Sequence, residues 1–132
     1  MKNETVRRLA EILDSTDDRE TRARSAAEAI RAARNYRWAG IYDVGDEEVE
    51  LVGHTGPDAH VAVRFENTRG AIGEAVDHRD TIVHGSEIVV PVFAAEIGTV
   101  MGTLNVESDG KIAKDDYDFL EACAMALMPL FE

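Results

Sequence analysis

The stretch that most constrains the fold of this chain runs from Ser86 to Ser108. It contains two β-rich runs, Ser-Glu-Ile-Val-Val-Pro-Val-Phe and Thr-Val-Met-Gly-Thr-Leu-Asn-Val-Glu-Ser, joined by a short connection that ends in glycine. Two such runs around a glycine-containing connection predict a β-hairpin. Because nearly every position over 88–93 is apolar, we expect this hairpin to lie inside a sheet that is covered on both faces.

The second run of the hairpin also places polar groups inside the sheet. Successive side chains of a strand point to opposite faces, so Thr103, Asn105 and Glu107 share one face. Leu104 and Val106 take the other face. A buried polar group without a partner costs about 1–3 kcal/mol. A bound ligand is one partner that would satisfy these groups.

The length of 132 residues fits one domain, with helices over 1–35, the sheet and its pocket over 36–110, and a C-terminal helix over 114–131. The 26 acidic residues outnumber the 14 basic ones and give a formal charge of −12. Such a charge repels phosphate backbones and anionic lipids, so we expect no nucleic-acid or membrane partner. The first eight residues lack the apolar core of a signal peptide, which predicts a cytoplasmic protein. The acidity fits a salt-rich cytoplasm or ordinary genomic composition equally well.

Two helices are expected before the sheet. The first follows an amphipathic stripe made of Val6, Leu9, Ala10 and Leu13. The second begins at a cap provided by Thr16 or Asp17. One of its sides carries Ala23, Ala26, Ala27, Ile30 and Ala33. These small side chains allow close approach, either to the sheet or to a second copy of the chain.

The rest of the chain alternates strands with one short helix. Strands are expected over 38–44, 49–53, 61–65 and 80–83, a short helix over 70–76, and a last helix after residue 113. This order describes an α+β fold, with a central antiparallel sheet of about five to six strands and the N- and C-terminal helices packed on one face. Neither a dinucleotide-binding Gly-x-Gly-x-x-Gly sequence nor a Walker A sequence is present.

The first of these strands carries two aromatic residues on one face. Trp38, Gly40 and Tyr42 alternate with Ala39 and Ile41. Aromatic residues four positions apart on a central strand are usually part of the core. They also have the shape of the wall of a ligand pocket.

Five segments resemble the GAF domain in their order and spacing. They are Trp38-Ala39-Gly40-Ile41-Tyr42, Gly70-x-x-Gly73-x-Ala75, Ser86-Glu87-Ile88-Val89-Val90-Pro91-Val92, Gly102-Thr103-Leu104-Asn105-Val106-Glu107-Ser108 and Asp116-x-x-x-Leu120. The resemblance covers about residues 26–130. It implies a sheet with helices on one side and a small-molecule pocket on the other.

Within that superfamily the chain looks most like the free methionine-(R)-sulfoxide reductases. This similarity implies a pocket lined by Trp38 and Tyr42. Glu87, Asn105 and Glu107 stand where those enzymes hold the acids that grip the amino acid. Asn105 in place of an acid lowers the negative charge of such a pocket.

The cysteines of these reductases are missing. Their chemistry needs a thiolate nucleophile and further cysteines to resolve the product. Ile72 stands where one cysteine of a Gly-x-Cys-Gly motif is expected, and residues 80–85 contain none. The single cysteine, Cys123, lies in an apolar stripe, where we expect a buried and inert thiol. No residue is therefore assigned a catalytic role.

Cofactor and metal sites are not expected. The motif of cyclic-nucleotide-binding GAF domains and the cysteine that attaches a bilin are both missing. His78 and His84 flank Asp80, but histidines near turns are commonplace and do not make a metal site. Glu87 and Glu107 keep two interpretations, as half-exposed groups at strand ends or as acids that select a donor on a ligand.

The sequence thus predicts a non-catalytic GAF-type sensory module that binds a small molecule and forms a homodimer through its terminal helices. A separate signalling protein would receive the signal. Two alternatives stay open: a divergent free methionine-(R)-sulfoxide reductase, and a dimerisation module without a ligand.

Overall fold

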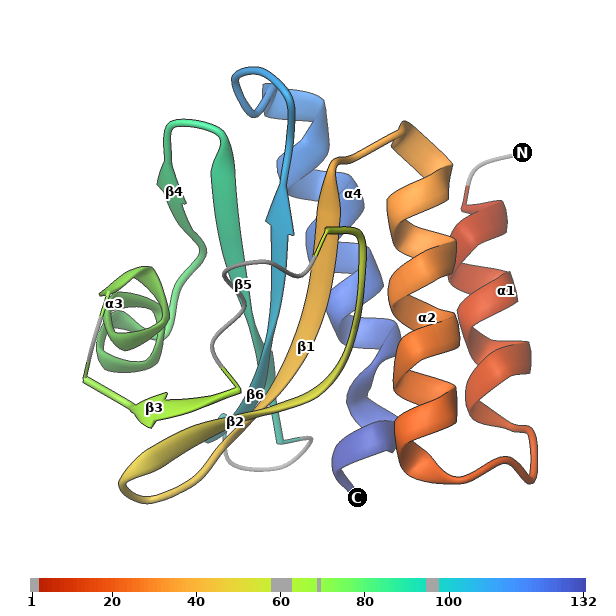
Figure 1. The fold of residues 1–132 in the computed structure, drawn as a ribbon, viewed down its shortest axis with the longest axis horizontal. Helices are drawn as coiled ribbons and strands as arrows, with labels where there is room; N and C mark the ends of the chain where they lie inside the picture. The colour runs from red at the N-terminus through yellow and green to blue at the C-terminus, as the bar shows by residue number, and fades with distance from the viewer. Residues whose placement is uncertain (1–2, 58–62, 69, 95–97) are drawn as a thin grey trace.

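A computed structural model describes residues 3–57, 63–68, 70–94 and 98–132. The elements follow one another as α1 (Glu4–Leu13), α2 (Arg19–Arg34), β1 (Trp38–Val44), β2 (Glu48–Thr55), β3 (Arg64–Glu66), α3 (Gly70–His78), β4 (Ile82–His84), β5 (Glu87–Phe93), β6 (Val100–Glu107), α4 (Lys114–Ala126) and the 3₁₀ helix η1 (Met128–Phe131). Helices flank the sheet on both sides (Figure 1).

The strands within the described residues form one sheet in the order β3-β2-β1-β6-β5-β4, and neighbouring strands are antiparallel. The predicted hairpin is β5 and β6, and β6 lies centrally between β1 and β5. Ile88, Val89 and Val90 are all buried, so both faces of β5 are covered. The α+β fold class and the antiparallel sheet predicted from the sequence are confirmed.

The larger core lies between the sheet and the three terminal helices α1, α2 and α4, which stand together on one side of it (Figure 1). The alanine side of α2 packs here, because Ala23, Ala26 and Ala27 are fully buried against this core. Gly53 of β2 permits the close approach, since a Cβ atom there would lie 2.9 Å from the backbone nitrogen of Arg24. This side of α2 was expected to pack on the sheet or on a second copy of the chain, and in the structure it packs on the sheet. Ala33, which was expected on the same side, is exposed.

Two helix boundaries differ from the prediction. Asp18, not Thr16 or Asp17, caps α2, because its side chain accepts a hydrogen bond from the backbone N–H of Thr21 at 2.8 Å. The C-terminal helix ends at Ala126 and tightens into η1 instead of continuing to residue 131. Pro129 explains the change, since it lacks the N–H that an α-helix would need at that position.

Two short strands also begin later than expected. Only residues 63–65 of the segment predicted over 61–65 lie inside the described part, and the strand there is Arg64–Glu66. The strand expected over 80–83 is Ile82–His84, because the Asp80 carboxylate accepts the N–H of Thr81 in a turn. No helix in the described ranges has both the length and the apolarity to cross a bilayer.

The opposite face of the sheet is covered differently, by the short helix α3 (Figure 1). A smaller apolar cluster lies there, made of Trp38, Tyr42, Val49, Ala71, Ile72, Ala75 and Val89. The predicted site residues all belong to this face of the sheet.

Candidate functional site

The register of the central strands brings the predicted site residues together. Trp38 of β1 pairs with Glu107 of β6, and Glu107 pairs in turn with Glu87 of β5. Two residues along, Asn105 pairs with Gly40, and Tyr42 follows on β1. Cross-strand partners share a face, so these side chains form one surface across three neighbouring strands.

Gly40 positions the indole of Trp38. A Cβ atom at Gly40 would collide with the six-membered ring of Trp38, so the indole lies along β1 over this glycine. Trp38 is only 6% exposed. The glycine in the Trp-x-Gly-x-Tyr strand therefore makes room for the aromatic wall of the site.

His54 joins the site although the sequence did not single it out. It pairs with Gly40 across β1 and β2, and its imidazole stacks on Trp38 with ring centroids 5.7 Å apart and planes inclined by 23°. The register of these two strands shifts between Ile41 and Tyr42, a β-bulge that strand alternation alone does not reveal. Only the pairing of β2 with β1 could have placed this histidine beside the tryptophan.

Two ring nitrogens of this stacked pair have no hydrogen-bond partner among the described residues. They are Nε1 of Trp38 and Nδ1 of His54, and both atoms are buried. A buried polar atom without a partner costs about 1–3 kcal/mol. A hydrogen bond to a group outside the described residues would remove this cost.

Two carboxylates face each other on the same surface. Glu87 and Glu107 are directly opposite on β5 and β6, and both are partly buried. Burial and then the charge of Glu107 raise the pKa of the Glu87 carboxyl, while His84 opposes the rise. Neither glutamate side chain has a hydrogen bond or ion pair within the described residues. His84, the cross-strand neighbour of Glu87 on β4, is bound to Glu74 at 2.8 Å. Like charges directly opposite each other are destabilising unless a cation or donor joins them.

The amide of Asn105 is held from its own strand. Asn105 and Thr103 are the two buried polar residues of β6, at 5% and 0% exposure. The Thr103 hydroxyl donates a hydrogen bond of 2.8 Å to Oδ1 of Asn105, which fixes the orientation of the amide. The neutral amide limits the negative charge of the surface to the two glutamates beside it.

Tyr42 closes the apolar end of the site. Its ring meets Phe65 of β3 edge-on, with centroids 5.7 Å apart. Burial, followed by the charges of Glu87 and Glu107, raises the pKa of Tyr42 to about 12. The phenol is consequently neutral at physiological pH and acts as a polar but uncharged wall.

The cysteine and the other acids lie elsewhere. Cys123 is fully buried in the core between α4 and the sheet, on the opposite face from Trp38, and burial raises the pKa of its thiol to about 12. Ile72, at the position of the expected cysteine, is a buried residue of α3 and packs in the apolar cluster beside the site. No group of three His, Cys, Asp or Glu residues able to hold a metal ion occurs among the described residues.

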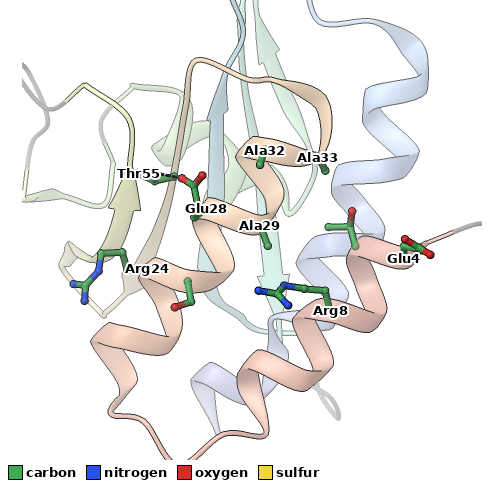
Figure 2. A pocket seen from close by; sticks show the side chains of 10 residues that line it. Glu4, Arg8, Arg24, Glu28, Ala29, Ala32, Ala33 and Thr55 are labelled. Carbon is green, nitrogen blue, oxygen red and sulfur yellow. Dashed lines mark hydrogen bonds between the residues drawn. The ribbon is translucent and has the colours of Figure 1, made fainter.

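A separate hollow of about 760 Å³ lies on the outer surface between α1 and α2 (Figure 2). Its lining combines small side chains with four charged ones, Glu4, Arg8, Arg24 and Glu28, which we call its rim. The residues that line it are Glu4, Thr5, Arg8, Arg24, Ser25, Glu28, Ala29, Ala32, Ala33 and Thr55. Thr55, next to His54 on β2, donates a hydrogen bond to Glu28 of α2.

Comparison with known proteins identifies the fold. No protein-family model and no curated protein matches the chain. Among solved structures, the free methionine-R-sulfoxide reductase from Neisseria meningitidis in complex with its substrate is similar, with a TM-score of 0.82 and 24% identity over 97% of this chain and 86% of that chain.

Two GAF domains are equally similar in shape. That of the Acinetobacter phosphoenolpyruvate-protein phosphotransferase gives a TM-score of 0.82 at 17% identity and covers 99% of this chain and 94% of that chain. The A. Aeolicus nlh2 GAF domain in an inactive state gives 0.81 at 12% identity, over 96% and 93% of the two chains. The chain therefore has a GAF-like fold, as the sequence motifs predicted.

Proposed function

We propose that this chain is a non-catalytic GAF-type module that binds a small molecule on the face of the sheet beneath α3. The ligand carries a cationic or N–H donor group that lies between Glu87 and Glu107, next to Trp38, Tyr42 and Asn105. Binding of this group is the event that a sensory module would report to a separate signalling protein.

One observation carries the proposal: the partly buried Glu87 and Glu107 lie directly opposite each other, and within the described residues no ion pair joins either side chain to a base. His84, across from Glu87 on β4, is bound to Glu74 instead. A sheet that served only as a scaffold would gain stability from a neutral or oppositely charged residue at either position. Two partly buried acids beside an aromatic wall are instead a common arrangement for a positively charged ligand.

The placement of Cys123 supports binding without catalysis. A reductase reaction on a ligand at Trp38 would need a thiolate within bonding distance of the sulfoxide sulfur. The Cys123 thiol is buried on the far face of the sheet with a pKa of about 12. The similarity to free methionine-R-sulfoxide reductases nevertheless makes amino acids and their sulfoxides sensible compounds to test as ligands.

The module is further proposed to form a homodimer through the outer surfaces of α1 and α2. The alanine side of α2 is buried against the sheet and is not free to contact a second copy. The small side chains available for such a contact are those that line the hollow in Figure 2. Its rim holds two acids, Glu4 and Glu28, and two bases, Arg8 and Arg24. In a chain of charge −12, such a balanced surface lets two copies meet with little repulsion.

The experiment is a thermal-shift screen against amino acids, their sulfoxides, aliphatic amines, purines and nucleotides. A ligand present at 100 times its dissociation constant adds about 2.7 kcal/mol to the free energy of unfolding. We expect amine-containing compounds to raise the melting temperature of the wild type and to lose that effect in Glu87→Gln.

Glu11→Gln is the matched control, since Glu11 is an exposed glutamate on α1. A screen in which no compound stabilises the folded protein would favour the dimerisation module without a ligand. Consumption of a sulfoxide in the presence of a dithiol, lost in Cys123→Ser, would favour the reductase instead.

A further inference from the structure

The proposed site has two ends of different chemistry. Glu87 and Glu107, on β5 and β6, can only accept hydrogen bonds when they are ionised. The stacked rings of Trp38 and His54, on β1 and β2, carry the two buried nitrogens that lack a partner. These groups share one face of four neighbouring strands, and adjacent strands are about 4.8 Å apart.

The end of the site formed by the rings of Trp38 and His54 is suited to a hydrogen-bond acceptor. The indole N–H of Trp38 can donate a hydrogen bond but cannot accept one. Nδ1 of His54 donates when the imidazole carries its proton on that nitrogen, and accepts otherwise. The two rings are stacked with their centroids 5.7 Å apart, so both unpartnered nitrogens belong to one aromatic pair.

We propose that His54 is a specificity-determining residue which, together with the indole N–H of Trp38, binds a hydrogen-bond acceptor on the ligand. This inference rests on the proposed function, because it concerns the other end of the same bound molecule. The ligand class it names is a small molecule with a cationic amine at one end and an acceptor oxygen a few bonds away. A simple amine lacks the second group, and a simple anion lacks the first.

The test uses three probes that differ in one group. L-norleucine carries an amine and a carboxylate, L-norleucinamide carries an amine and a neutral carbonyl, and n-pentylamine carries the amine alone. Binding is followed by the fluorescence of Trp38, the single tryptophan of the chain, so the signal arises inside the site. We expect at least one of the two acceptor-containing probes to bind at least tenfold more tightly than pentylamine. Whether norleucine or norleucinamide binds more tightly shows whether a charged or a neutral acceptor is preferred.

Two substitutions of His54 separate hydrogen bonding from stacking. His54→Phe keeps an aromatic ring over Trp38 and removes both ring nitrogens, whereas His54→Asn keeps a nitrogen near the position of Nδ1. We expect His54→Phe to weaken binding of the preferred probe about tenfold, the value of one hydrogen bond. It should leave the affinity for pentylamine unchanged, and His54→Asn should bind the preferred probe within about threefold of the wild type. Melting temperatures of both variants verify that they are folded.

The outcomes distinguish this inference from the proposed function. If all three probes bind equally and His54→Phe changes nothing, the role of His54 is wrong while the amine site of Glu87 and Glu107 stands. If His54→Phe weakens pentylamine as much as the preferred probe, the histidine acts only through stacking, and the inference is again wrong. If no probe binds the folded wild type, both the inference and the amine-binding function fail together.

Discussion

At the scale of single residues, the candidate site was predictable where strand alternation applies. Trp38 and Tyr42 share a face because they are four positions apart on one strand, and Asn105 and Glu107 are two apart on another. The resemblance to GAF domains implied that these residues line one pocket. The pairing of β1 with β6 places the two pairs beside each other. His54 was missed because a bulge precedes Tyr42 and because a lone histidine at a strand end carries no pattern.

The Glu87 carboxylate should lower the stability of the ligand-free protein, although it is proposed to strengthen ligand binding. Its pKa is raised in the folded protein, so the wild type loses stability as the pH rises from the ordinary glutamate range through that raised value. We expect Glu87→Gln without ligand to be more stable than the wild type by about 0.2–1 kcal/mol at pH 8, the range for cross-strand pairs. The gain should fade as the pH falls to 4.

Urea unfolding at the two pH values measures this difference. Glu11→Gln should show no comparable gain, because Glu11 is exposed on α1 away from the site. A Glu87→Gln variant that is less stable than the wild type at pH 8 would mean that the carboxylate already has a partner within the protein.

At the scale of elements, periodicity predicted the helices and strands, but local features that it does not capture set several boundaries. Pro129 ends α4 early, and the cap of α2 is one residue later than the pattern indicated. The anchoring of α4 was not visible in the sequence at all. Asp116, in its first turn, accepts hydrogen bonds from the hydroxyl of Tyr36 at 2.6 Å and from Arg34 at 3.1 Å, 80 and 82 positions earlier.

Tyr36→Phe tests this anchor. Burial alone would raise the pKa of Asp116, but hydrogen bonds from Tyr36, Ala113 and Arg34 outweigh it and lower that pKa. Ionised Asp116 therefore stabilises the folded protein at pH values above the ordinary aspartate pKa. This contribution to the free energy of unfolding is lost as the pH falls through the lowered pKa of Asp116. Removing the hydroxyl should cost about 1.5–3 kcal/mol at pH 7, and less at a pH where Asp116 is protonated.

Tyr117→Phe provides the matched control, because Tyr117 lies one position further on α4 and is 36% exposed. Urea unfolding curves at pH 7 and pH 3 give the comparison. Equal effects of the two tyrosine substitutions would show that the bond to Asp116 does not hold α4 in place.

At the scale of the whole molecule, the charge of −12 and the layer order were readable from the sequence, whereas the surface left for a second copy was not. Because the alanine side of α2 packs on the sheet, the outer hollow is the surface that we propose for a contact between copies. Ala32 lines this hollow and is exposed, so a change there should not disturb the core.

Ala32→Glu is therefore expected to convert a dimer into a monomer without lowering the melting temperature appreciably. An added acid would break the charge balance of the rim and meet its own copy across a twofold axis. Size-exclusion chromatography with light scattering gives the mass. Ala10→Glu, an exposed alanine on α1 outside the hollow, should remain dimeric. A wild type that is monomeric at high concentration would contradict the dimer.

The most direct measurement is the proton–nitrogen NMR spectrum of the indole of Trp38 during addition of amines and amino acids. With one tryptophan in the chain, the spectrum holds one indole N–H resonance, and it belongs to the centre of the proposed site. We expect that resonance to shift on addition of a compound that stabilises the protein, and to stay in place in Glu87→Gln. An indole resonance unmoved by every stabilising compound would show that the face beneath α3 is core and not a binding site.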